Sequence, residues 1–214
     1  MQVLDLSQDF SVHTPAFASY DGPSIKWVKR LAFDKAGGQE ITTTLHVGTH
    51  LDAPAHFHSG GKFIGDLPLD FLVGPACVVD LERMGVGDYG LYGPEHFERW
   101  ERETGLRIEP DEILIIHTGY HRHYPENWAD RSGVDETRYF IRHPGPTRAF
   151  AEWVLDRRLR WLAVVAGSAD HSVMAFSLIV SACSSVSLRA SKRSHGTSSA
   201  MLQRACSSDR KISG

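Results

Sequence analysis

Cysteine is scarce in this 214-residue chain, and the arrangement of the few that occur excludes several classes of protein. The three cysteines, Cys77, Cys183 and Cys206, are odd in number and have no C-x-x-C spacing. This pattern argues against a disulfide framework or a cysteine-based zinc site and favours a reducing compartment. We therefore predict a cytoplasmic protein. We also expect no signal peptide, because the first residues lack a basic start followed by an apolar stretch.

Long apolar runs are also missing. No stretch approaches the ~18 residues that a membrane-spanning helix needs, so we expect no membrane partner. The apolar share of 42% and the charged share of 23% are ordinary for a soluble globular protein. The chain is long enough to bury a full core, and no repeat or linker divides residues 1–180.

The C-terminal segment differs from the rest in composition. Residues 1–180 carry 25 acidic and 17 basic side chains, whereas residues 181–214 carry one acidic and six basic ones, with eleven serines and no Phe, Tyr or Trp. Such a segment buries too little apolar surface to become ordered, so we predict one domain over 1–180 and a disordered Ser/Arg-rich tail. The sparse bases and missing aromatics argue against a nucleic-acid partner.

The apolar patterns within residues 1–180 predict a mixed α/β fold. β-branched or apolar runs predict strands, and amphipathic stretches that begin at a proline predict helices. We expect strands at 3–6, 40–47, 76–81, 113–117 and 161–166, and helices from 94 to 105 and from 146 to about 160.

The densest group of chemically capable side chains comprises four histidines and one aspartate within thirteen positions. The spacing of four between His46 and His50 suits one face of a helix, but Gly48 and Pro54 argue against a helix. Because proline drives the residue before it toward an extended backbone, His50 and Asp52 should point the same way. Gly48 can supply the turn that brings His46 to them.

Two neutral imidazoles and a carboxylate suit Zn²⁺, Mn²⁺ or Fe²⁺ and leave coordination positions open. We predict that His46, His50 and Asp52 hold a divalent metal, Zn²⁺ or Mn²⁺, which activates a water molecule as nucleophile and polarises a carbonyl oxygen. His56 lies nearby but outside this set, so it is the candidate general acid/base. A single histidine on a strand is more often structural, but four beside an aspartate favour a metal site.

Other side chains leave alternatives open. Four aromatic residues lie in the irregular stretch 120–142, where they either stack on a substrate or pack the loop: Tyr120, Tyr124, Trp128 and Tyr139. Two neighbouring histidines either approach the site or are exposed: His121 and His123. Three N-terminal aromatics could contact substrate or a second subunit: Phe10, Phe17 and Trp27. Asp170 and His171 follow a strand end and could support a metal ligand, and Cys77 is expected to be a buried packing residue.

The string HVGTHLDAPAHF resembles the H-x-G-T-H-x-D-A-P-x-H-F signature of a hydrolase family. This family includes bacterial kynurenine formamidase, isatin hydrolase and proteins described as putative cyclases. Shorter likenesses extend from residue 3 to about residue 175: D-L-S at 5–7, H-T-G at 117–119, H-P-G at 143–145 and S-A-D-H at 168–171.

The resemblance implies a swivelling β/β/α fold, a single domain with mixed sheets and flanking helices, commonly as a homodimer or larger oligomer. It implies that His46, His50 and Asp52 are metal ligands and that His56 is the catalytic histidine. The reaction it implies is hydrolysis of a C–N amide bond in a small substrate, such as an N-formyl amide or a cyclic amide or imide. The alternatives are a cyclase or dehydratase that uses the metal as a Lewis acid, and an inactive metal-binding relative.

The likeness to the family ends after His171. Family members continue with proline, where this chain has Ser172, and then supply a further histidine and a glutamate to the metal site. Residues 181–214 contain no glutamate and only one histidine, His195. We hypothesise that this tail is the product of a frameshift; a natural C-terminus is the alternative.

Overall fold

The computed structural model describes residues 5–17, 20–124 and 133–168. Its strands are β1 (Ser24–Lys29), β2 (Gly38–Thr42), β3 (Ala76–Asp80), β4 (Leu91–Tyr92), β5 (Ile113–His117), β6 (Gly145–Pro146) and β7 (Trp161–Val164). Its α-helices are α1 (Leu31–Asp34), α2 (Pro94–Thr104), α3 (Glu136–Phe140) and α4 (Arg148–Arg157). Four short 3-10 helices are η1 (Pro54–His56), η2 (Ile64–Asp66), η3 (Leu69–Phe71) and η4 (Tyr120–His123).

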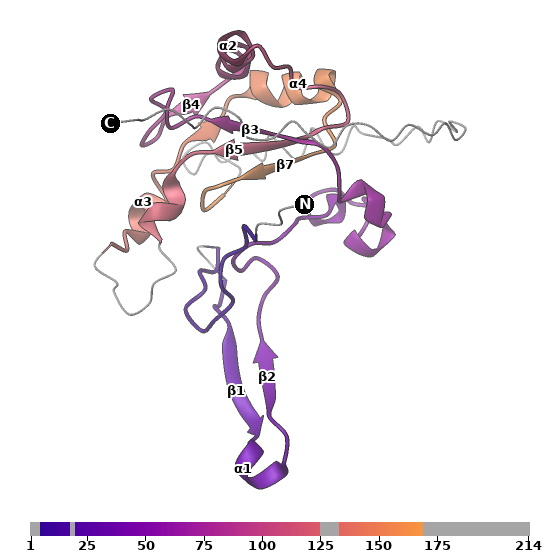
Figure 1. Cartoon of the computed structure of the whole chain (residues 1–214), viewed down its shortest axis with the longest axis vertical. Coiled ribbons are helices and arrows are strands. Elements are labelled where there is room, and N and C mark those ends of the chain that lie inside the picture. Colours follow the sequence, from indigo (N-terminus) through magenta and orange to yellow (C-terminus); the bar gives the residue numbers. More distant parts are fainter. Residues whose placement is uncertain (1–4, 18–19, 125–132, 169–214) are drawn as a thin grey trace, which may run out of the picture.

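A three-stranded parallel sheet in the order β3-β5-β7 forms the centre of the fold. Helix α2 lies between β3 and β5 in the chain, and α4 lies between β5 and β7, as parallel strands require crossover connections. Both helices cover the same side of the sheet (Figure 1). The predicted mixed α/β fold with parallel and antiparallel sheets and flanking helices is therefore confirmed.

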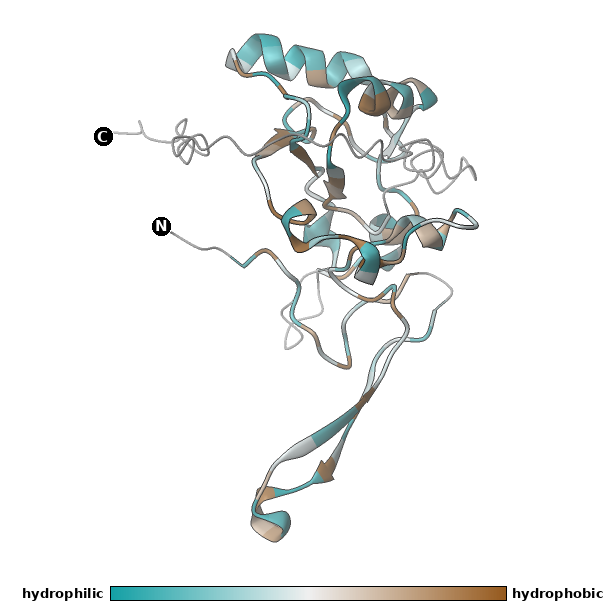
Figure 2. Cartoon of the chain, turned by 90° about the vertical axis from the view of Figure 1, so that its right-hand side faces the viewer, coloured by the Kyte–Doolittle hydropathy of each residue, from teal (hydrophilic) through white to brown (hydrophobic). Residues whose placement is uncertain are grey.

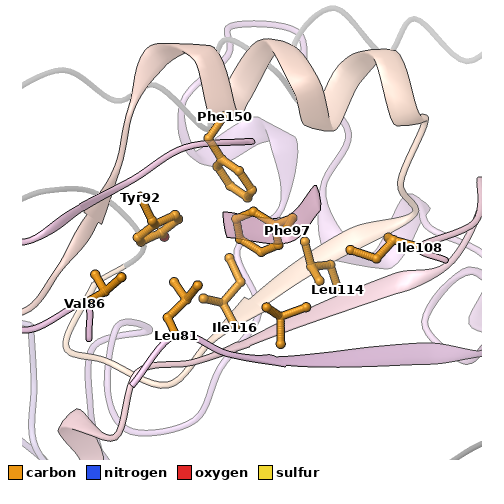
Figure 3. Close-up of a cluster of buried hydrophobic side chains, with 9 residues drawn as sticks. Leu81, Val86, Tyr92, Phe97, Ile108, Leu114, Ile116 and Phe150 are labelled. Atoms are coloured by element: carbon orange, nitrogen blue, oxygen red, sulfur yellow. The ribbon is translucent and has the colours of Figure 1, made fainter. Parts of the chain in front are cut away.

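The hydrophobic core lies between this sheet and its two helices (Figure 3). Phe97 of α2 and Phe150 of α4 are fully buried, and their rings stack with centroids 4.7 Å apart. Tyr92 of β4 meets the edge of Phe150 at 5.2 Å, and the sheet contributes Leu114 and Ile116. These aromatic pairs fix how α2 and α4 sit against the sheet, because buried rings contribute both large apolar area and specific geometry.

The strands predicted at 76–81 and 113–117 are confirmed as β3 and β5, and the strand predicted at 161–166 forms β7, which ends two residues earlier. The helix predicted from Pro94 is confirmed. It ends where Gly105 adopts φ +69°, a left-handed conformation that glycine reaches without steric cost.

Three further predicted elements differ from the structure. The strand expected at 40–47 ends at Thr42, and only Val47 pairs again, through an isolated bridge to Ala16. The second helix begins at Arg148 rather than Pro146, because Pro146 pairs in β6 and the Thr147 side chain caps the first turn. Residues 5 and 6, the described part of the strand expected at 3–6, have no regular structure.

Several predictions fall outside the described residues. These are the tail at 181–214 with its frameshift hypothesis, the end of the domain at 180, Trp128, and the pair Asp170 and His171. In the described ranges the longest helix is α2, with 11 residues, and none there has the length and apolarity of a membrane span.

Strands β1 and β2 form an antiparallel hairpin with α1 at its tip, and this hairpin extends well away from the sheet and its helices (Figures 1 and 2). One face carries Ile25, Trp27 and Ile41, whereas the other carries the ion pair of Lys26 with Glu40 at 2.5 Å. No residue of either strand is buried, and Trp27 is 58% exposed.

An ion pair joins the two helices that cover the sheet. Arg157 of α4 donates two hydrogen bonds to the Glu101 carboxylate of α2, at 2.9 and 3.0 Å. Burial alone would raise the pKa of Glu101, but the hydrogen bonds from Arg157 and the Ile108 backbone lower it below its ordinary value. The carboxylate therefore stabilises the fold when it is ionised.

We expect Glu101→Gln to lower the free energy of unfolding by about 1–3 kcal/mol at pH 7, because Arg157 loses a charged partner in a half-buried position. A carboxyl group with a lowered folded-state pKa contributes stability above its unfolded pKa and loses it as the pH falls through the folded pKa. The gap between variant and wild type should therefore narrow as the pH falls below the ordinary pKa of a glutamate side chain. Urea unfolding at several pH values measures this. The matched control is Glu103→Gln, because the Glu103 carboxylate pairs with Arg99 at an exposed position. Equal effects of both substitutions would contradict the prediction.

Candidate metal centre

The loop that carries the histidine motif is held by the N-terminal segment. Phe17 donates its backbone N–H to the carbonyl of His46 at 2.9 Å, and Gly48 donates to the carbonyl of Pro15 at 2.9 Å. Gly48 has φ +60°, and a Cβ there would lie 2.7 Å from the Thr14 methyl carbon. Only glycine fits this position, so the turn expected at Gly48 is present and brings His46 toward His50.

The three predicted metal ligands come together at one point. His46 Nδ1 lies 3.2 Å from both His50 Nε2 and Asp52 Oδ1, and the last two atoms lie 3.5 Å apart. A tetrahedral ion with bonds of about 2.0–2.1 Å places its ligand atoms roughly 3.3 Å from one another. The triangle of donors therefore fits a tetrahedral divalent ion, and its open side faces solvent, since the Asp52 side chain is 43% exposed. Their role as ligands remains a prediction.

The surroundings of the histidines favour the protonation state that a metal needs. His50 Nδ1 lies 2.8 Å from the carbonyl oxygen of Gly48, so the proton sits on Nδ1 and Nε2 presents its lone pair to the other donors. Burial lowers the pKa of His46, and His56 and His50 lower it further against the opposing charge of Asp52. His46 is therefore neutral near pH 7, as metal ligation requires.

His56 lies beside this group but outside it. Pro54 begins the 3-10 helix η1, and Ala53 before it is extended, with φ −83° and ψ 156°, as expected. The ring of His56 is tilted against that of His46, with centroids 4.3 Å apart, and the ring of Phe57 meets it edge-on at 3.9 Å. His56 thus has the position expected of a general acid/base, although this role also remains a prediction. His58 is exposed on the same loop.

A cavity of about 520 Å³ adjoins the motif through Tyr20. Tyr20 lines this cavity and also packs against His46, with ring centroids 5.1 Å apart. Its lining also includes Tyr124 and Phe140, which pack against each other. Tyr20 was not predicted from the sequence; its place in the same N-terminal stretch as Phe17 was the available signal.

The loop aromatics after β5 are mainly packing residues. Tyr120, Tyr124 and Tyr139 are each less than 9% exposed. His121 faces His117 at the end of β5, and His123 packs against Tyr120, so these histidines join the sheet edge rather than the motif. Cys77 is half-buried rather than buried as expected, and its thiol donates a hydrogen bond to the Glu112 carboxylate at 3.2 Å.

The fold and the site together describe a mixed α/β protein with a candidate divalent-metal centre on a loop before the parallel sheet. The profile of the family described as "Putative cyclase" matches residues 4–171, and the chain belongs to this family.

Kynurenine formamidase of Geobacillus thermodenitrificans (strain NG80-2) is 40% identical over 144 residues, which are 66% of this chain and 59% of that protein. Kynurenine formamidase of Salinibacter ruber (strain DSM 13855 / M31) is 36% identical over 112 residues, half of each chain. The chain thus spans between a half and three-fifths of the length of these relatives. The resemblance to this family predicted from the motif is confirmed.

Among solved structures, isatin hydrolase A from Ralstonia solanacearum superposes with a TM-score of 0.67 at 23% identity, over 85% of this chain and 73% of that one. Isatin hydrolase A from Labrenzia aggregata bound to benzyl benzoate superposes with a TM-score of 0.65 at 22% identity, over 79% and 69% of the two chains. At these identities the likeness establishes the shared fold.

Proposed function

We propose that the chain is a metal-dependent hydrolase that cleaves a C–N amide bond of a small substrate, an N-formyl amide or a cyclic amide or imide. The single observation that carries the proposal is the triangle of donors from His46, His50 and Asp52, with the His56 ring tilted against that of His46. The kynurenine formamidase relatives support the amide, because their names specify cleavage of an N-formyl group.

His46, His50 and Asp52 would hold the ion, Zn²⁺ or Mn²⁺, through two imidazole nitrogens and one carboxylate oxygen. When bound, such an ion lowers the pKa of water and polarises a carbonyl oxygen. His56 then accepts a proton from the attacking water and returns it to the nitrogen that leaves. The Gly48 carbonyl keeps His50 oriented, through the hydrogen bond to its Nδ1.

The cavity beside Tyr20 supports a small aromatic substrate. Its volume of about 520 Å³ lies within the ~300–1,000 Å³ typical of small-molecule sites. Tyr20, Tyr124 and Phe140 supply aromatic walls, against which a planar ring can stack. Since Tyr20 also contacts His46, a ring held there would bring its amide group toward the candidate metal centre.

The test measures metal content and hydrolysis together on the full chain without a histidine tag. We expect His50→Ala to hold one ion fewer per chain than the wild type by mass spectrometry, and to lose amide hydrolysis. The control is His58→Ala, which removes an exposed histidine from the same loop. N-formyl anilines and cyclic amides form the substrate panel. A folded chain whose metal content is the same in His50→Ala as in the wild type, or that binds metal but hydrolyses none of the panel, would reject the proposal.

We further propose that the chain forms a homodimer through the β1–β2 hairpin. Isolated two-stranded hairpins are marginally stable in water, and the face with Ile25, Trp27 and Ile41 has no cover from the described residues. A second copy of the chain would cover this face, because symmetric dimers use the same patch on both subunits. We also propose a cytoplasmic location, which the spacing of the three cysteines supports.

We expect Trp27→Glu to weaken self-association at least tenfold, because a charge replaces the largest apolar side chain of the hairpin face. Sedimentation equilibrium over a range of concentrations measures this. The matched control is Lys26→Gln, one residue earlier and on the opposite face, which should leave the dimer intact. A monomeric wild type, or equal effects of both substitutions, would refute the hairpin interface.

A further inference from the structure

A second group of potential metal ligands lies at the carboxyl end of the parallel sheet. Asp80 ends β3, His117 ends β5, and Glu82 follows two residues after Asp80. One ligand atom from each of these three residues lies within 4.8 Å of the others. None of the three belongs to the histidine motif, and the proposed hydrolysis makes no use of them. The edge beyond the carboxyl ends of parallel strands is where α/β proteins commonly bind ligands.

The sheet register itself places these donors. Asp80 and His117 are direct partners in the parallel pairing of β3 with β5, and Leu81 donates its backbone N–H to the His117 carbonyl at 2.9 Å. Leu81 is fully buried in the core, so the residues on either side of it, Asp80 and Glu82, project away from the core together. Backbone hydrogen bonds, and not flexible side chains alone, therefore hold the three potential metal ligands at one place.

The turn after β5 leaves room for the Glu82 carboxylate. Gly119 has φ +78°, and a Cβ at this position would lie 2.7 Å from the Glu82 carboxyl carbon. The side chain of any other residue would meet this carboxylate. The absence of a side chain at Gly119 thus allows Glu82 to reach toward Asp80 and His117.

Ion pairs orient both carboxylates of the group. His117 Nδ1 lies 3.3 Å from Asp80 Oδ1, and two arginines neutralise the carboxylates: Arg83 lies 3.2 Å from Asp80, and Arg122 pairs with Glu82. Asp80 also accepts the backbone N–H of Arg83 at 3.2 Å, and this hydrogen bond holds its carboxylate beside His117.

An ion can reach these donors from solvent. The side chains of Asp80, Glu82 and His117 are 31%, 47% and 28% exposed. Arg83 is 75% exposed, so it can swing away from Asp80 when a more strongly charged ion arrives. The ring of His121 lies 5.6 Å from that of His117, which brings a second imidazole to the edge of the group.

We propose that Asp80, Glu82 and His117 form a second divalent-cation site, distinct from the histidine motif, that takes a transition ion such as Zn²⁺. The nitrogen donor with two carboxylates suits such ions better than Ca²⁺ or Mg²⁺, which prefer oxygen alone. Glu82 and His117 flank the turn at Gly119, so a bound ion fixes the start of η4 against β3. It thereby holds the segment that carries Tyr124 to the cavity wall.

Calorimetric titration with Zn²⁺ alone tests the site on the metal-stripped full chain in the His50→Ala background, where the motif is disabled. We expect one remaining Zn²⁺ site, weakened at least tenfold by adding His117→Gln. Asp80→Asn is a second variant that keeps the acceptor for the Arg83 backbone N–H. The control is His96→Ala, since His96 pairs with Glu95 at 3.2 Å but belongs to no three-donor group among the described residues.

The melting temperature and far-UV circular dichroism together distinguish a metal site from a structural ion pair. Zn²⁺ should raise the melting temperature of the His50→Ala chain, and this rise should vanish when His117→Gln or Asp80→Asn is added, while far-UV circular dichroism stays unchanged. Zn²⁺ binding that persists in both double variants, or that His96→Ala abolishes equally, would overturn the proposal. Comparison of wild type with His50→Ala reports on the motif separately, so failure of one site is distinguishable from failure of the other.

Discussion

Replacement of His56 by alanine is expected to lower kcat/KM for amide hydrolysis by about 10²–10⁴-fold while the bound metal stays in place. The reason is the position of the ring, which lies 4.3 Å from the ring of His46 but outside the three donors that converge on one point. His56 can therefore carry a proton without supplying a ligand. Steady-state kinetics and metal content, measured on the same preparation, test both parts of this expectation.

The control for this experiment is His58→Ala, which removes an exposed histidine two residues further along the same loop and should change neither quantity. Loss of metal in His56→Ala would assign His56 to the ligand set and contradict the proposed division of roles. Unchanged kcat/KM would remove His56 from the reaction altogether.

The second large effect concerns stability. We expect Phe97→Ala to lower the free energy of unfolding by about 3–5 kcal/mol, because the ring is fully buried between α2, α4 and the sheet and its loss leaves a cavity. Three aromatic neighbours lose their contact at once: Tyr92, Phe150 and Trp153. Urea unfolding followed by tryptophan fluorescence and circular dichroism measures the change.

The same substitution at an exposed phenylalanine provides the comparison. Phe63 is 71% exposed, so Phe63→Ala should change the free energy of unfolding by less than about 0.5 kcal/mol. A small effect at Phe97 would mean that the two helices do not depend on this aromatic contact.

The strands of the central sheet were predictable because they are short, nearly continuous runs of apolar residues. Residues 76–80 and 113–117 are such runs, and both form strands at the expected places. Helix α2 was also predictable, because proline is favoured in the first turn of a helix and glycine directly after the last. Pro94 and Gly105 occupy these two positions. In these elements the local sequence and the tertiary structure favour the same conformation.

Predictions were wrong where partners distant in sequence decide the structure. The run from Glu40 to Val47 has β-branched residues throughout, yet pairing stops at Thr42 because the opposing strand begins at Ser24, the register partner of Thr42. Pro146 suits a first helical turn, but it pairs with Tyr92 of β4 instead. Propensity alone contains no information about either partner.

The candidate metal centre was predictable because its donors are close in sequence and because Pro54 and Gly48 restrict the backbone between them. The group at Asp80, Glu82 and His117 was not, because His117 joins the other two only through the pairing of β3 with β5. Its signal was present in the sequence: each of the two strands ends in a polar residue that can bind a metal.

The short span of the motif has a consequence for how metal and folding influence each other. His46, His50 and Asp52 lie within seven consecutive positions, so an unfolded chain needs to close only a very short loop to bring them together. The unfolded ensemble therefore retains part of the affinity for the ion. Because an ion stabilises a protein only through its preference for the folded form, its effect on the melting temperature should fall short of what its dissociation constant alone suggests. The same short span makes residues 46–52 a segment that can capture an ion before the parallel sheet has assembled.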